Sequence, residues 1–445
     1  MELIQMSAAR IAKEIRSGII TSEQVVKTFL DRIAALEKTV QAWTFLDPDF
    51  ALYQARTADR AREERVPLGL LHGVPVGIKD IFDTADMPTE NGTVLHVGRQ
   101  PTEDATVVSL LRSAGAIILG KTVTTELAVY APGKTRNPHH QEHTPGGSSS
   151  GSAAAVAAHM VPLAIGTQTN GSIVRPASYC GVIGFKASHG SISRYGVLHQ
   201  SWHLDQVGVF TKTIEDAALL SEVIMIFDSR DPNMKPRARL SLRELALQIP
   251  STPPRIAFVK SPVWHHADKE TQTAFADLMP LLSDNVEEIE LPAIFDEAIE
   301  LHRIIMEADL AISFAKEYEH GRTQLSTTLR GMIERGQKVL AIEYNDAVGK
   351  VPLLSAALEK IFKCYDAILT PATTGQAPHG LESTGSPIFC TIWTLCGLPA
   401  ISLPLLKGSA GLPLGVQLVG RKWNDGLLLK TGNWLMKRLG KEKEL

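Results

Sequence analysis

Residues 145–186 read PGGSSSGSAAAVAAHMVPLAIGTQTNGSIVRPASYCGVIGFK, and this stretch decides the predicted fold. It opens with glycines and serines at 146–152, where glycine permits unusual backbone conformations and serine supplies hydroxyl oxygens. Residues 152–159 are mostly alanine, the strongest helix former, and the preceding serines are suitable N-caps. The apolar run 161–165 then predicts a short buried strand.

A second loop of small residues follows this strand at 166–172, with the sequence GTQTNGS. Such a loop can turn several successive N–H groups toward one point, which is how an oxyanion hole is built. The candidate donors are the N–H groups of Thr169, Asn170, Gly171 and Ser172. Two serine-bearing loops joined by one helix and one strand indicate a site made of two neighbouring hydroxyls.

A base for this site is predicted upstream, in the segment LHGVPVGIKD at 71–80. Val74, Val76 and Ile78 alternate as in a strand, which places Lys79 at the strand's end. A lysine can act as a base where burial and neighbouring donors lower its pKa toward neutrality.

These motifs resemble the amidase signature family, whose members are Ser–cis-Ser–Lys hydrolases. The twin-glycine serine loop matches at 146–149, the nucleophile loop at 171–172, and GLPLGVQLVG at 411–420 is similar to the family's closing strand. Ser148 and Ser172 are 24 residues apart, the family's spacing. The resemblance implies that Ser172 is the nucleophile, Ser148 the bridging serine after a cis peptide, and Lys79 the base. It also implies that no metal or cofactor is needed.

The predicted fold class is α/β: a single large α/β/α domain with a mixed central sheet flanked by helices, as the resemblance implies. The alternation of strand and helix patterns over 68–130 is typical of this class. Residues 1–65 show helical periodicity and are predicted to be an N-terminal helical segment packed on the core. Residues 66–445 are predicted to form one catalytic domain, with a proline-bearing excursion or lid near 230–255.

Composition excludes several classes of function. With 44% hydrophobic and 21% charged residues, the chain is typical of soluble globular proteins. A formal net charge of −3 and a pI near 6.5 give no electrostatic reason to expect nucleic acid or membrane as a partner. Charged residues interrupt the N-terminal apolar positions, and the four cysteines lack metal or redox spacing. We therefore expect a cytoplasmic protein with a small-molecule substrate; a homodimer is left open.

Three alternative interpretations were weighed. Lys121 is a rival base, although a surface or loop position is the expected one. His139, His140 and His143 resemble a metal-binding spacing, but they lie in a loop-forming segment without a fixed fourth ligand. Ser149 fits the G-x-S-x-G pattern of α/β-hydrolases, yet that motif needs a preceding hydrophobic strand, and residues 136–145 (RNPHHQEHTP) cannot form one.

The chain departs from the family pattern around Ser172. Gln168 stands where most members have an acidic residue, Asn170 replaces a small residue, and Val174 replaces an arginine, with Arg175 one place later. Since the acid and the arginine normally interact, their joint absence indicates a coordinated change. Lys79, Ser148 and Ser172 are all present, which favours retained catalysis.

The predicted function is hydrolysis of carboxylic amides, aryl or alkyl, through an acyl-enzyme on Ser172, with carbamates and esters as further candidates. Gly147, Tyr130, Ile392 and Trp393 are the predicted substrate contacts. The alternatives are a non-catalytic scaffold and the glutaminase-type subunit of a tRNA-dependent amidotransferase. That subunit uses charged pocket residues for glutamine, whereas the corresponding segment 385–393, GSPIFCTIW, has no acidic residue.

Overall fold

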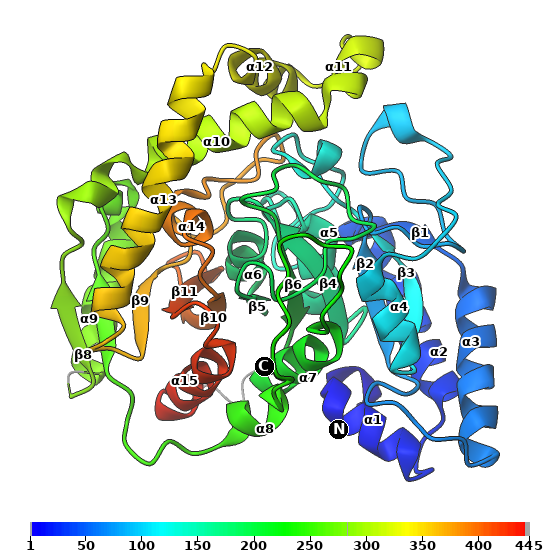
Figure 1. Cartoon of the computed structure of the whole chain (residues 1–445). Helices are drawn as coiled ribbons and strands as arrows, with labels where there is room; N and C mark the ends of the chain where they lie inside the picture. Colours follow the sequence, from blue (N-terminus) through cyan, green and yellow to red (C-terminus); the bar gives the residue numbers. More distant parts are fainter. Residues whose placement is uncertain (1, 283, 441–445) are drawn as a thin grey trace.

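The computed structural model describes residues 2–282 and 284–440, and within them eleven strands form one mixed sheet (Figure 1). The strand order is β1-β3-β2-β4-β6-β5-β10-β11-β9-β7-β8. A single α/β domain with a large sheet flanked by helices is confirmed. The strands are β1 (Trp43–Leu46), β2 (Pro75–Lys79), β3 (Ile117–Thr122), β4 (Leu163–Gln168), β5 (Ile183–Lys186), β6 (Gln206–Thr211), β7 (Ile256–Val259), β8 (Val286–Ile289), β9 (Ala367–Pro371), β10 (Ala400–Lys407) and β11 (Pro413–Gly420).

The pairing of β2 with β4 brings the two predicted halves of the site together. These strands are parallel, with Val76 opposite Leu163 and Ile78 opposite Ile165. Because parallel strands end at the same edge of a sheet, Lys79 at the end of β2 lies near the loop that follows β4.

Fifteen α-helices lie in the described residues. They are α1 (Ala8–Arg16), α2 (Ser22–Val40), α3 (Pro48–Glu63), α4 (Thr106–Ser113), α5 (Ser150–Ala157), α6 (Val174–Cys180), α7 (Ile214–Ile224), α8 (Leu242–Leu247), α9 (Lys269–Leu281), α10 (Ala298–Ser313), α11 (Ala315–Gly321), α12 (Thr327–Gly336), α13 (Ala341–Ile361), α14 (Ile388–Leu395) and α15 (Asp425–Arg438).

The two faces of the sheet carry different helices. Ala164 and Phe210 pack in one apolar cluster with the alanines of α5, whereas Ile165 and Val209 pack in another with residues of α7 and α15. Neighbouring residues of a strand point to opposite faces of the sheet, so β4 contributes side chains to both clusters. The helix α5, with its serines, therefore lies against the same strands that carry Lys79 and the 166–172 loop.

A third apolar cluster joins α10, α12, α13 and α14 to the sheet. Figure 1 shows α10, α12 and α13 gathered on one side of the molecule, with α14 between them and the strands. Helix α10 packs against α12, α13 and α14. This arrangement brings a helical wall close to the loop that follows β4.

The N-terminal segment differs from the prediction of helices alone. Residues 43–46 form β1, which pairs antiparallel with β3 and joins the sheet. The cause is local: the Glu37 carboxylate accepts the N–H groups of Ala42 and Trp43, and Gln41 takes the left-handed conformation that ends α2. In the 230–255 segment, α8 packs against α7 and α15, and a lid function there stays a prediction.

Over residues 2–282 and 284–440, none of the helices combines the length and apolar character that crossing a bilayer requires.

Candidate active site

Lys79 is a fully enclosed ionisable group of the site. Its side chain has no exposed surface, and its Nζ donates to Ser148 Oγ at 2.7 Å and to Thr167 Oγ1 at 2.9 Å. Burial disfavours the ammonium form and lowers the pKa of Lys79 well below its usual value. Asp205 opposes this shift and Arg175 reinforces it. A lysine in this state can accept a proton from the serine hydroxyl that it contacts.

Ser148 lies just before α5, in the turn that the glycines of the 146–152 run make possible. Gly146 has a φ of +81°, a conformation that favours glycine, and the Gly147–Ser148 peptide bond is cis. The neighbouring Ser149 is fully buried, and its Oγ donates to the Thr167 carbonyl. This places Ser149 as an anchor of the loop rather than as an exposed nucleophile.

Ser172 lies in the loop between β4 and α6, and 6% of its surface is exposed. The two serine loops are neighbours, because Arg175, three residues after Ser172, donates to the Gly147 carbonyl next to Ser148. Among the residues that the structure describes, Ser172 Oγ has no hydrogen-bond partner, Ser148 included. The link from Ser148 to Ser172 therefore stays a prediction.

The backbone of the Ser172 loop has free donors where an oxyanion hole was predicted. Within residues 2–282 and 284–440, the N–H groups of Thr169, Asn170, Gly171 and Ser172 reach no acceptor. Unsatisfied neighbouring N–H groups are suited to bind a developing negative charge. Their use as an oxyanion hole stays a prediction.

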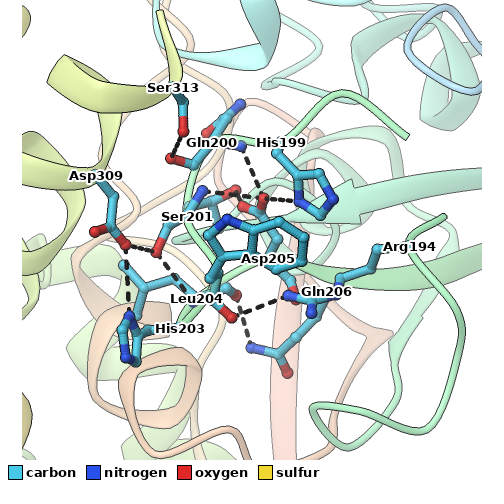
Figure 2. A network of polar contacts seen from close by, with 12 residues as sticks. Arg194, His199, Gln200, Ser201, His203, Leu204, Asp205, Gln206, Asp309 and Ser313 are labelled. Carbon is cyan, nitrogen blue, oxygen red and sulfur yellow. Dashed lines mark hydrogen bonds and ion pairs between the residues drawn. The ribbon is translucent and has the colours of Figure 1, made fainter. Parts of the chain in front are cut away.

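Several side chains hold this loop from outside. Asp205 accepts the Thr169 hydroxyl at 2.6 Å, and Thr394 donates to the Asn170 carbonyl at 2.6 Å. Asp205 is itself fixed by the N–H groups of Gln200 and Ser201, as Figure 2 shows. The loop is thus braced both by the 199–206 segment and by α14.

His302 on α10 was missed in the sequence. It is 2% exposed, and its Nε2 lies 3.0 Å from the Thr169 carbonyl. Because a carbonyl can only accept, Nε2 carries the proton of this contact. Burial lowers the pKa of His302 to about 4, so the ring is neutral at pH 7. The sequence signal was a histidine next to the apolar positions Leu301 and Ile305 of a helical pattern.

A cavity of about 370 Å³ opens beside the loop. Its wall includes Tyr130, Asn170 and Thr391, which are linked: Asn170 Nδ2 donates to Tyr130 Oη at 3.0 Å, and Thr391 Oγ1 donates to Asn170 Oδ1 at 2.8 Å. Apolar side chains complete much of the wall, among them Met306 and Ile388.

Charged groups also reach this cavity. The carboxylate of Glu307 is nearly enclosed and accepts from both Arg303 and Arg335. The negative charge inside the cavity wall is therefore compensated by two arginines at its rim.

The four predicted substrate contacts occupy different positions. Tyr130 lines the cavity. Gly147 faces Thr384 and Thr125, whose side chains a Cβ at this position would meet. Ile392 and Trp393 are 2% and 1% exposed and pack in the apolar cluster of α10 and α14. A substrate-binding role for these residues stays a prediction.

Lys121 is not the surface or loop lysine that was expected. It is fully buried in β3, 3.3 Å from the Asp80 carboxylate, and donates to the carbonyls of Phe82 and Pro88. The position follows from register, because β2 and β3 are parallel and Lys121 lies opposite Ile78. Its contacts are those of a buried ion pair, and Ser148 is not among them.

Two histidines of the 139–143 loop bind backbone carbonyls. His139 Nε2 lies 2.8 Å from the Cys180 carbonyl, and His143 Nδ1 lies 2.7 Å from the Ala377 carbonyl. These contacts fasten the loop to α6 and to the segment after β9.

The comparison with known proteins fits this geometry. A family model described as Amidase matches residues 24–429. The chain belongs to the amidase signature family. It is 34% identical to a glutamyl-tRNA(Gln) amidotransferase subunit of Agathobacter rectalis, over 97% of this chain and 93% of the relative. The corresponding subunit of Streptomyces coelicolor is also 34% identical, over 97% and 95%.

Two solved structures share the fold of this chain. The peptide amidase from Stenotrophomonas maltophilia superposes with a TM-score of 0.84 at 28% identity, covering 98% of this chain and 97% of that one. A protein described with a vestigial complex that reveals the origins of an s-triazine catabolic enzyme superposes with a TM-score of 0.90 at 26% identity, covering 97% and 98%. Amidase chemistry is supported at the level of the family.

The positions at which this chain departs from the family pattern have defined contacts. Gln168 Oε1 accepts the N–H groups of Ile173 and Val174, at 2.8 and 3.0 Å, and its Nε2 donates to Thr394 Oγ1. An uncharged amide thus orders the start of α6. Val174 is fully buried in the apolar cluster of α10 and α14. An arginine at this position would bury its charge among apolar side chains.

Proposed function

We propose that this amidase hydrolyses carboxylic amides through an acyl-enzyme on Ser172. The contact that carries the proposal is the 2.7 Å hydrogen bond from Lys79 Nζ to Ser148 Oγ, in a setting where burial disfavours the ammonium form. Ser148 passes the proton of Ser172 to neutral Lys79 as Ser172 attacks the carbonyl carbon. The four free N–H groups of residues 169–172 stabilise the tetrahedral oxyanion.

The relay then runs in reverse. The protonated Lys79 returns its proton through Ser148 to the departing nitrogen, so that a neutral amine leaves and the acyl group stays on Ser172. Water attacks this ester, the relay takes the proton of the water, and the carboxylic acid is released with Ser172 restored. The largely apolar cavity beside Asn170 is the proposed place of the substrate's variable part and favours alkyl and aryl groups.

The test is a panel of anilides, aliphatic amides, carbamates and esters, measured on wild type and on Ser172→Ala. We expect turnover of at least one amide class, which Ser172→Ala abolishes. A serine-directed fluorophosphonate should label wild type once per chain at Ser172. Amide turnover that survives Ser172→Ala would refute the assignment, and a chain with neither turnover nor labelling would be a scaffold.

A second candidate is the glutaminase subunit of a tRNA-dependent amidotransferase, favoured by the identity of 34% over 97% of the chain to such subunits. Against it stands the missing acidic residue in 385–393. The two arginines of the cavity are also already matched by two carboxylates, because Arg303 pairs with Glu300 and Glu307 and Arg335 pairs with Glu307. Glutaminase activity that appears only when the partner subunits of such an enzyme are added would establish this function. Glutamine left intact with and without them, together with turnover of simple amides, would exclude it.

A further inference from the structure

Arg175 is a buried cation with an unusual set of partners. It belongs to α6 and has no exposed surface. Its Nε and Nη2 donate to the Gly147 carbonyl at 3.2 and 2.7 Å, and its Nη1 donates to the Gly385 carbonyl at 2.5 Å. All three hydrogen bonds therefore end on backbone carbonyls of loops that border the candidate active site.

No carboxylate balances this charge. Throughout residues 2–282 and 284–440, Arg175 takes part in no ion pair, and the ionisable groups that face it are Tyr130, Tyr179, Cys390 and Lys79. The guanidinium lies 5.8 Å from the centre of the Tyr130 ring. Burying an arginine without an acidic partner is costly, so a purely structural role would be better filled by a neutral amide.

The two carbonyls tie together the halves of the site. Gly147 immediately precedes Ser148. Gly385 belongs to the segment before α14, which also contains Pro387. Pro387 lies so close to Gly171 that a Cβ added at Gly171 would be 2.8 Å from the Pro387 side chain. One guanidinium thus connects the loop of the bridging serine with the segment that covers the nucleophile loop.

The charge of Arg175 also acts on Lys79. Two charged groups bear on this lysine: Asp205 favours its ammonium form and Arg175 its neutral form, while Ser148 and Thr167, which contact Nζ, are uncharged. Arginine stays protonated over the whole range of pH in which enzymes work, so its influence does not change with pH.

We propose that Arg175 is a positioning residue of the site: it fixes the Ser148 loop through the Gly147 carbonyl and ties this loop to the segment before α14 through the Gly385 carbonyl. This inference rests on the proposed function, because it concerns the same lysine and serines. It gives a role to the arginine that stands one place later than in the family pattern.

The experiment measures the rate of Ser172 labelling by a fluorophosphonate against pH, and kcat/KM on the best substrate of the panel. Arg175→Gln removes the charge, and Arg175→Lys keeps it but cannot span both carbonyls. For Arg175→Gln we expect the acidic limb of both profiles to move to higher pH, because a more basic Lys79 needs higher pH to become neutral. For Arg175→Lys we expect the limb at the wild-type pH and a loss of about 10- to 100-fold in kcat/KM.

Arg32→Gln is the matched control, because the Arg32 guanidinium also donates to a backbone carbonyl, that of Ala158, away from the site. Its profile should coincide with that of wild type. The inference would be overturned if the acidic limb of the Arg175→Gln profiles stayed at the wild-type pH, or if Arg175→Lys kept the wild-type kcat/KM. If Arg175→Gln does not fold, the kcat/KM of Arg175→Lys decides whether the inference holds. Failure of wild type itself to be labelled would instead refute the proposed function.

Discussion

The stability of this protein should depend on pH through His302, and the dependence has a calculable size. In the folded chain burial holds the pKa of His302 at about 4, against an ordinary value of 6.5. Above pH 6.5 the ring is neutral in both states. As the pH falls from 6.5 toward 4, the unfolded chain binds a proton that the folded chain does not, so the free energy of unfolding falls.

The magnitude follows from the conversion of about 1.36 kcal/mol for each pKa unit. Between pH 7.5 and pH 5, His302 should remove about 2 kcal/mol from the free energy of unfolding, and about 3 kcal/mol once the pH is below 4. The variant His302→Gln keeps an N–H donor for the Thr169 carbonyl but has no group that titrates in this range. Its loss of stability over the same interval should be smaller than that of wild type by about 2 kcal/mol.

The assay is urea unfolding followed by circular dichroism at several pH values from 7.5 to 5. Titration of other groups is common to both proteins and cancels in the difference. His320→Gln is the matched control, because His320 is exposed and its Nδ1 contacts only the Lys316 carbonyl of its own helix. Curves of wild type and His302→Gln that stay parallel down to pH 5 would refute the reasoning.

Three further outcomes are expected. Lys79→Met should lose the acidic limb of the pH–rate profile and cleave amides at least ~100-fold more slowly. The loss for esters should be smaller, because their leaving group needs less protonation, and equal losses for amides and esters would count against the acid role of Lys79. Lys121→Met leaves the buried Asp80 carboxylate without its cation and should cost about 3–5 kcal/mol in urea unfolding, whereas a cost near zero would contradict the ion pair. Tyr130→Phe removes the hydroxyl that accepts from Asn170, and we expect KM to rise about fivefold while Ser172 labelling stays stoichiometric.

Local sequence patterns predicted the central elements well. The alanine run predicted α5, the apolar run 161–165 predicted the first half of β4, and the alternation of Val74, Val76 and Ile78 predicted β2 with Lys79 at its end. These elements are short and buried, so propensity and periodicity agree with the tertiary packing. Strand β1 was not predicted, since four residues after a long helix carry little periodic signal and its pairing with β3 is a long-range contact.

The partners of the candidate site were harder to predict. Burial in a parallel pair of strands, not the sequence around Lys121, puts that lysine beside Asp80. His302 and Asp205 reach the Thr169 region from segments 133 and 36 residues away. Nothing in a local pattern encodes such contacts, because they arise from how α10 and the 199–206 segment pack on the sheet.

The sequence by itself determined the residues with chemistry to offer: two serines in glycine-bearing loops and a lysine at a strand end. Only the tertiary structure decided the state of these groups. The pKa of Lys79 is low because the folded chain removes its side chain from water, and Ser148 accepts its hydrogen bond because α5, which begins two residues after Ser148, packs against β2 and β4. Desolvation and proximity are properties of the packed chain, so no single segment of sequence carries them.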